Sequence, residues 1–343
     1  MHLPISILSN ADPSMVKMDP FPHIILIDAL PLEFATNLTN SFPKHLFDLT
    51  SNNQRLDISA INVVNSPDIS QDWKQFIAYH SSKEFFKEVL SLFEHSLLAN
   101  KNINLATLNN LNTGIRFQDT FDEKDCLLDA QISINTPVTK KSSVRKAHTD
   151  NNNKIFSGLF YLRQDDDKSS GGDLQICNWN DSYSYKKKLL TYKESLSPGH
   201  YTVFDEIPYA NNVAVLFLNS LDALHCVTPR DLTGHTRTFV NLVGELPCDI
   251  FEKHTKTQKR LLRFKKDCVQ KLKKLHQIIL KVNNILIFFI ITLKERIAPR
   301  KYPGTFTTSL MRPKNLYITC KLYFSTCNYC SYKGDFATTI EWE

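Results

Sequence analysis

Seven short β-type segments follow one another between residues 114 and 245, and no helix-type segment separates them. Turn-forming stretches such as Asn-Thr-Pro, Gly171-Gly172 and Ser-Pro-Gly lie between them. The segments are 114–118, 127–138, 154–163, 172–179, 201–205, 211–219 and 237–245. Short strands at this spacing predict an antiparallel sandwich or a jelly-roll barrel.

The residues before this β core have a different periodicity. In 70–100, apolar residues recur every three or four positions, which predicts helix. A strand-like run begins at His23, and 53–62 is polar and turn-rich. The expected fold is therefore mainly β, with a helical N-terminal layer, a double-stranded β-helix (jelly-roll) core at about 115–245 and a helical C-terminal extension.

The charge of the chain is unevenly distributed. The whole chain has 41 Lys+Arg and 35 Asp+Glu, a net charge of +6. Residues 1–250 carry 22 basic and 29 acidic side chains, whereas 251–301 carry 15 and 3. We therefore expect three parts: a domain over 1–250, a basic helical extension over 251–301 and a poorly defined tail over 302–343.

The basic extension leaves its partner open. It could contact a membrane or another anionic surface, or it could be the solvated face of a packing helix. Its apolar run, 285–293, is too short to span a bilayer. It also lacks the interleaved aromatic residues of a single-strand binder, so no nucleic-acid partner is indicated.

The N-terminus and the cysteines favour a cytoplasmic protein. No basic region precedes the first apolar stretch, so a signal peptide is not expected. The eight cysteines are then expected to be reduced. Cys320, Cys327 and Cys330 lack a fourth ligand at zinc-site spacing, which favours free thiols in the tail.

The sequence His148-Thr149-Asp150 is the strongest candidate for chemistry. In a strand, residues two apart project to the same face, so an imidazole and a carboxylate would converge on one side of the sheet. A metal site needs a third ligand, for which His200, His225 and His235 are available. His225 is favoured because it follows a strongly apolar strand. Two histidines and one carboxylate suit a non-haem Fe(II) site.

Arg237 begins the last β-type segment, twelve residues after His225. An antiparallel neighbour would bring this guanidinium into the same cavity, where its planar fork can bind a carboxylate. His235 remains a weaker alternative for this role. Asn219 and Ser220 are expected to close a strand, and the acidic run 165–167 is expected to be a solvated loop tip.

Together these residues resemble the Fe(II)/2-oxoglutarate-dependent dioxygenases, within them the prolyl 4-hydroxylase-like branch. The matching positions, in chain order, are His148-x-Asp150, Gly171-Gly172-Asp173-Leu174, His225-Cys-Val-Thr-Pro229, Gly234 and Arg237. The resemblance implies Fe(II) on His148, Asp150 and His225, and 2-oxoglutarate with its distal carboxylate on Arg237. It also implies O₂ as a cosubstrate, Tyr161 as a candidate hydrogen-bond donor to 2-oxoglutarate, and ascorbate as a further candidate cofactor.

The implied activity is hydroxylation with release of succinate and CO₂. The substrate would be a protein side chain such as proline, a small molecule or a sugar. Two alternatives stay open: a catalytically silent jelly-roll binding protein with a residual metal site, and a membrane- or nucleic-acid-associated protein acting through its tail.

Overall fold

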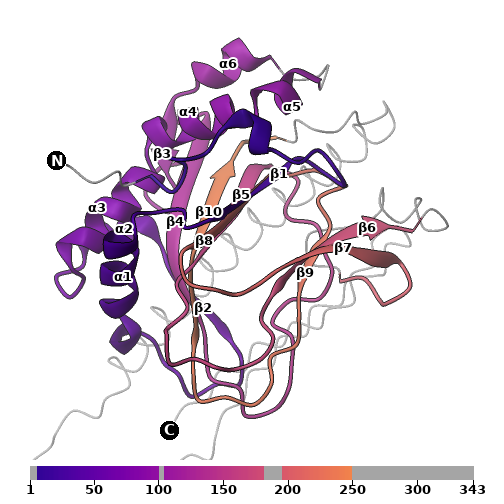
Figure 1. The fold of residues 1–343 in the computed structure, drawn as a ribbon. Coiled ribbons are helices and arrows are strands. Elements are labelled where there is room, and N and C mark those ends of the chain that lie inside the picture. Colours follow the sequence, from indigo (N-terminus) through magenta and orange to yellow (C-terminus); the bar gives the residue numbers. More distant parts are fainter. Residues whose placement is uncertain (1–5, 100–103, 181–194, 249–343) are drawn as a thin grey trace, which may run out of the picture. The chain divides into compact units, whose positions relative to one another are not determined.

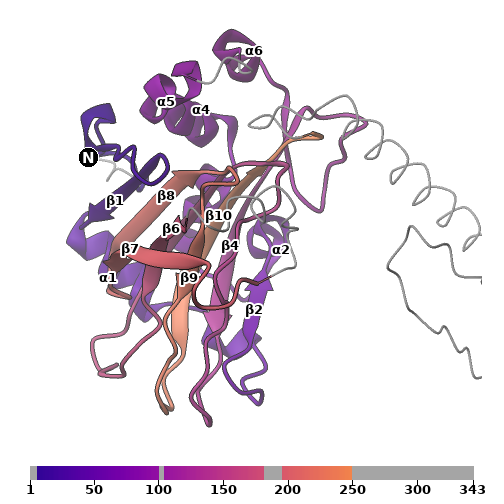
Figure 2. The same ribbon diagram turned by 90° about the vertical axis from the view of Figure 1, so that its right-hand side faces the viewer.

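Two β-sheets lie face to face in the computed structural model, which describes residues 6–99, 104–180 and 195–248 (Figures 1 and 2). The larger sheet has the strand order β1-β8-β5-β10-β4-β2, with β3 beside β4, and the smaller has the order β7-β6-β9. The strands are β1 (His23–Ile27), β2 (Arg55–Ile58), β3 (Thr113–Ile115), β4 (Cys126–Asn135), β5 (Lys154–Tyr161), β6 (Leu174–Trp179), β7 (Tyr201–Ile207), β8 (Val213–Leu218), β9 (His225–Val227) and β10 (Arg237–Glu245). All described residues belong to one unit of the chain, Met1–Thr257.

Strand pairing is antiparallel except between β3 and β4, which run parallel. Strand β10 lies between β4 and β5, and its register places Arg237 opposite Asn135 and Phe239 opposite Tyr161. Because side chains alternate between faces, Arg237 and Phe239 share the face of β10 that is turned toward the smaller sheet. The register thus brings a charged residue into the space between the sheets.

The N-terminal helices cover the opposite face of the larger sheet (Figure 1). Apolar side chains of these helices, including Trp73, Phe76 and Phe85, form one core with Phe160 and Val240 of the sheet. Each fully buried Phe contributes roughly 1.5–3 kcal/mol by leaving water. The helices are α1 (Leu32–Asn40), α2 (Ala60–Asn65), α3 (Gln71–His80), α4 (Lys83–Leu92), α5 (Glu94–Ala99) and α6 (Leu105–Asn109), with 3₁₀ turns at Pro13–Met15 and Lys44–Leu46.

The helical prediction for 70–100 is confirmed, and the segment forms three helices. The Ser70 hydroxyl caps α3 by accepting from the Trp73 N–H, and the Ser82 hydroxyl caps α4 by accepting from the Phe85 N–H. Ser82 comes two residues after the end of α3, so its cap separates α4 from α3 within the apolar pattern.

Each of the seven predicted β-type segments overlaps a strand. The prediction of turn for 53–62 is wrong, because this stretch forms β2 and the start of α2. Strand β2 lies at the sheet edge and pairs with β4 alone, so its outward side chains can be polar and it lacks the expected apolar pattern. The sheets and the helical layer are consistent with a double-stranded β-helix.

The predicted extension at 251–301, its apolar run 285–293 and the tail 302–343 lie outside the described residues, as do the three tail cysteines. Among the residues that the structure describes, no helix has the length and apolar character needed to cross a membrane.

Candidate metal centre

His148, Asp150 and His225 converge, as the sequence predicts. Each offers one ligand atom, and these atoms all lie within 4.8 Å of one another. Over the described ranges, no other group of His, Cys, Asp and Glu meets this geometry. His225 begins β9, and His148 faces it through an isolated bridge in which each backbone N–H donates to the other residue's carbonyl at 3.0 Å.

The expectation that His148 and Asp150 lie in one strand is wrong. His148 forms only the single bridge to His225, and Asp150 lies in the loop that leads into β5. Strand pleating therefore does not orient the carboxylate. Its orientation comes from hydrogen bonds to the start of β5.

Both imidazoles are held so that the same nitrogen faces the cluster. Nδ1 of His148 donates to the backbone oxygen of Lys146 at 2.8 Å, and Nδ1 of His225 donates to that of Ala223 at 3.0 Å. These bonds leave Nε2 of each ring as a free electron-pair donor. Burial lowers the pKa of both His148 and His225, so both rings are neutral, which metal ligation requires.

The carboxylate of Asp150 is held through one oxygen. Its Oδ2 accepts from the Lys154 ammonium at 3.0 Å and from the Ser157 hydroxyl at 2.5 Å, while its Oδ1 lies 3.7 Å from Nε2 of His148. Burial opposes ionisation, but the Lys154 charge and the Ser157 hydrogen bond hold the pKa of Asp150 well below its usual range. Asp150 is thus an anion with Oδ1 available for a ligand.

This donor set fits a divalent first-row metal ion. Two neutral imidazoles and one carboxylate are borderline-to-hard donors, and their placement matches the 2-His-1-carboxylate arrangement of non-haem iron sites. His148 and His225 contribute nitrogen through Nε2, and Asp150 contributes oxygen through Oδ1. The residues present therefore satisfy the requirements of an Fe(II) site.

A second polar feature surrounds Arg237, which is 2% exposed. Its guanidinium carbon lies 4.8, 5.2 and 4.9 Å from the ring centroids of Tyr161, Tyr209 and Phe239. Nη1 donates to Oδ1 of Asn135 at 3.2 Å, whereas Nε and Nη2 have no partner among the described residues. The Tyr161 hydroxyl and Asn135 Nδ2 are also buried without a partner.

These unpartnered atoms define an anion site. All of them can donate hydrogen bonds, and Arg237 forms no ion pair with a described carboxylate. Buried donors without acceptors are rare in folded proteins, because each loses its hydrogen bonds to water. A carboxylate would satisfy several of them at once. Apolar side chains lie between this site and the metal cluster, since Phe217 belongs to the same buried cluster as Tyr161 and Phe239 and its ring lies 4.9 Å from the His225 ring.

Gly171 and Gly172 allow a loop to approach these residues closely. Both have positive φ, 79° and 91°. A Cβ at Gly171 would lie 2.0 Å from the carbonyl oxygen of Pro229, and one at Gly172 would lie 3.1 Å from Cδ of Arg237. The glycine pair noted in the sequence is therefore required by backbone conformation and by close packing.

The other candidate residues lie elsewhere. His200 is outside the cluster and its Nδ1 bonds the Ser197 carbonyl, while His235 has a 39% exposed side chain with Nδ1 3.9 Å from Asp166. Asn219 closes β8 as expected, and its amide donates to backbone oxygens of Asn151 and Lys154 in the loop that carries Asp150.

Several site residues were missed by the sequence analysis. The run 165–167 was expected to be a solvated tip, but Asp167 is buried, where it accepts hydrogen bonds from Ser169 and lies 3.6 Å from Arg163. No apolar periodicity marks such charged or polar side chains, because their burial depends on partners that the pattern does not identify. The residues missed are Asn135, Lys154, Ser157, Tyr209 and Arg230.

Solved structures similar to this chain include oxygenases. The chain matches a prolyl-4-hydroxylase from Pseudomonas putida with a TM-score of 0.39 and 12% identity, covering 68% of this chain and 98% of that chain. It matches a prolyl hydroxylase from Trichoplax adhaerens, in complex with a hypoxia inducible factor peptide fragment, with a TM-score of 0.39 and 14% identity over 68% and 88%. A 2OG-Fe(II) oxygenase family oxidoreductase from Burkholderia pseudomallei matches with a TM-score of 0.35 and 11% identity over 67% and 88%. The chain resembles these oxygenases.

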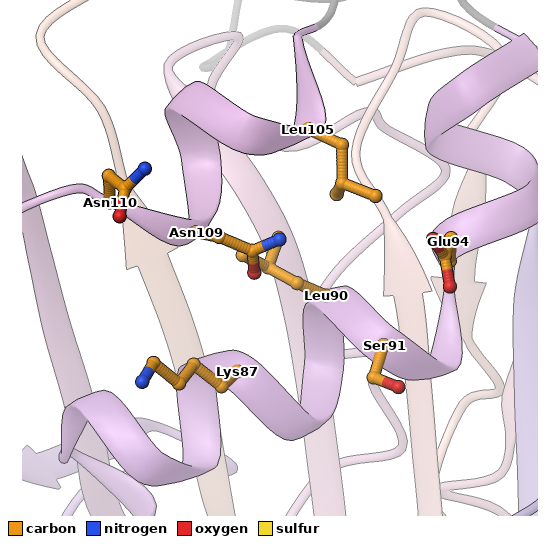
Figure 3. A pocket seen from close by; sticks show the side chains of 7 residues that line it. All are labelled: Lys87, Leu90, Ser91, Glu94, Leu105, Asn109 and Asn110. Atoms are coloured by element: carbon orange, nitrogen blue, oxygen red, sulfur yellow. The ribbon is translucent and has the colours of Figure 1, made fainter.

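No protein-family model and no curated protein matches the sequence. What the site can do therefore follows from its own side chains. A separate surface cavity of about 470 Å³ lies between α4, α5 and α6, and none of its lining residues belongs to the metal cluster or the anion site (Figure 3).

Proposed function

We propose that this chain is an Fe(II)- and 2-oxoglutarate-dependent dioxygenase that hydroxylates its substrate and releases succinate and CO₂. The observation that carries the proposal is the pairing of two sites between the sheets: a buried His148/Asp150/His225 cluster and a buried group of unpartnered donors at Arg237. A metal and a dicarboxylate would satisfy both sites.

His148, Asp150 and His225 would hold the metal by three of its coordination positions, leaving the others for cosubstrate and O₂. Iron(II) bound there supplies the oxidising power for C–H hydroxylation by O₂, coupled to the decarboxylation of 2-oxoglutarate. The Lys154 and Ser157 contacts keep Asp150 ionised and aimed through Oδ1. The apolar side chains between the sheets exclude water from the reacting groups.

Arg237 would bind the distal carboxylate of 2-oxoglutarate with the help of Tyr161. The free Nε and Nη2 of Arg237 offer two donors on one edge of the guanidinium, which suits a bidentate carboxylate. The Tyr161 hydroxyl is a third donor. Burial raises the pKa of Tyr161, so the phenol keeps its proton and can donate it to a hydrogen bond.

The substrate proposed is a C–H bond of a protein side chain such as proline, of a small molecule or of a sugar.

Succinate formation tests the proposal. The full chain is incubated with Fe(II), ascorbate, O₂ and 2-oxoglutarate, and succinate is quantified by mass spectrometry. We expect succinate with the wild type and none above background with Asp150→Ala, because the metal loses its anionic ligand. Asp165→Ala, which changes an exposed carboxylate of a loop, is the matched control and should behave as the wild type.

Two results would contradict the proposal. One is undiminished succinate formation by Asp150→Ala. The other is wild-type protein that binds Fe(II) and 2-oxoglutarate yet forms no succinate, which would indicate a silent binding protein with a residual metal site.

A further inference from the structure

We propose that Arg230, a second buried arginine, positions Arg237 and makes the anion site selective for ligands with a distal carboxylate. This inference rests on the proposed function, because it concerns how the same cosubstrate is recognised. Arg230 is a positioning residue: it acts through its neighbours and through its charge.

Arg230 is buried without a counter-ion. It is 1% exposed, and no carboxylate of the described residues forms an ion pair with it. A buried charge is strongly disfavoured unless polar groups compensate it. Its partners here are neutral acceptors: Nη1 donates to Oδ1 of Asn53 at 3.2 Å and to the carbonyl of Thr136 at 3.1 Å, and Nη2 donates to the carbonyl of His235 at 2.8 Å.

These three acceptors belong to chain segments that surround Arg237. Thr136 directly follows Asn135, whose side chain accepts from Nη1 of Arg237. His235 lies two residues before Arg237, where β10 begins. Asn53 precedes β2, the edge strand that pairs with β4. One guanidinium therefore joins the loops at the ends of β2, β4 and β10, around the residue that would bind the carboxylate.

Arg230 and Arg237 also lie close to each other. A Cβ added at Gly172 would lie 3.1 Å from Cδ of Arg237 and 3.3 Å from Cδ of Arg230, so the two side chains flank this glycine. Burial, with the positive charge of Arg237 as a smaller cause, lowers the pKa of Arg230 to about 10. Arg230 therefore keeps its charge at neutral pH, and the carboxylate of Asp167 offsets only part of the repulsion between the two arginines before an anion binds.

The charge of the site has a consequence for specificity. A ligand with a distal carboxylate places its negative charge near two buried cations, whereas a ligand with a methyl group at that position does not. Removing the Arg230 charge should therefore weaken binding of the ligand with a distal carboxylate by about tenfold. Binding of the ligand with a distal methyl group should change little.

Binding measurements on the full chain, loaded with redox-inert Ni(II), test this. The ligands are 2-oxoglutarate and 2-oxopentanoate, which differ by the distal carboxylate, and Kd is measured by calorimetry. Arg230→Met should raise Kd for 2-oxoglutarate about tenfold and shift Kd for 2-oxopentanoate by less than about twofold. In the succinate assay, with Fe(II) in place of Ni(II), it should raise KM for 2-oxoglutarate with kcat largely kept. Arg230→Lys should recover part of the loss, since it restores the charge but not the fork.

Arg116→Met is the control. Arg116 is a part-buried arginine, and it pairs with Asp129 of β4 and Glu245 at the end of β10 rather than with residues of the anion site. It should bind both ligands as the wild type does. If Arg230→Met fails to fold by circular dichroism, Asn53→Ala replaces it, which removes one acceptor of Arg230 and keeps both charges. Asn53→Ala should then weaken 2-oxoglutarate binding by less than the factor expected for Arg230→Met, and it should leave 2-oxopentanoate binding unchanged.

Equal weakening of both ligands by these variants would show a general structural role and overturn the proposal, as would unchanged binding of 2-oxoglutarate. The proposed function fails separately: in that case the wild type forms no succinate, or Arg237→Met binds 2-oxoglutarate as tightly as the wild type does.

Discussion

Asp129 is a buried carboxylate in β4 that caps the N-terminus of α2. It is fully buried, and its Oδ1 accepts the Ala60 N–H at the start of α2, where the side chain of Ser59 makes no capping bond. Arg116 approaches its Oδ2 only to 3.7 Å. Burial raises the pKa of Asp129 from its ordinary value of 3.8 to about 6. We predict that Asp129→Asn stabilises the protein at neutral pH.

The sign follows from proton linkage. The folded state binds the proton more tightly than the unfolded state does, so this residue's contribution to stability is present below pH 3.8 and is lost as the pH rises through 6. A pKa difference of one corresponds to about 1.4 kcal/mol, so the loss above pH 6 reaches about 3 kcal/mol. Asn keeps the acceptor for Ala60 but loses the contact with Arg116, so a net gain of about 1–2 kcal/mol is expected at pH 7.5.

Urea unfolding of wild type and Asp129→Asn at pH 4.5 and pH 7.5 measures this gain. The stability difference between the two proteins should be larger at pH 7.5 than at pH 4.5, and comparing the two proteins cancels the titration of other groups. Asp129→Ala serves as a control for the cap, since it removes the charge and the acceptor together. A difference that is the same at both pH values, or a less stable Asp129→Asn at pH 7.5, would refute the reasoning.

Two further predictions concern the metal cluster and the loop beside Arg237. Lys154→Met removes the ammonium that holds Oδ2 of Asp150, so the affinity for Co(II) should fall roughly tenfold or more. Visible absorption measures this affinity, and Tm should stay close to that of the wild type. Unchanged affinity would mean that Ser157 alone orients the carboxylate. Gly171→Ala places a Cβ 2.0 Å from the Pro229 carbonyl at a positive φ, so it should destabilise the chain by about 2 kcal/mol or more in urea unfolding; wild-type stability would show that this loop moves freely.

Sequence patterns predicted the parts of this fold that repeat with a period. Alternating apolar residues located the strands from β3 to β8 and β10, and three-to-four spacing located α3 and α4. Strand β2 was missed because an edge strand buries few side chains, and β9 because three residues are too short for a pattern.

The candidate site shows a different limit. The order of His148, Asp150 and His225 predicted their convergence, but the reason given for Asp150 was wrong, because hydrogen bonds from β5 orient it rather than strand pleating. Arg230 and Asp167 were missed because a charged residue is expected at the surface unless its partners are known. Two partners of Arg230, Asn53 and Thr136, are far away in the sequence.

The backbone bridge between His148 and His225 has a consequence for metal choice. The two imidazoles are held at their positions by hydrogen bonds to the backbone, so the protein itself determines where the two nitrogen ligands lie. An assembled nitrogen and oxygen site binds divalent ions in the order Mn²⁺ < Fe²⁺ < Co²⁺ < Ni²⁺ < Cu²⁺ > Zn²⁺. Iron is thus among the weaker competitors, and the ion found in purified protein should reflect the composition of the growth medium. The supply of reduced iron, rather than the shape of the site, would then determine how much of the protein carries iron.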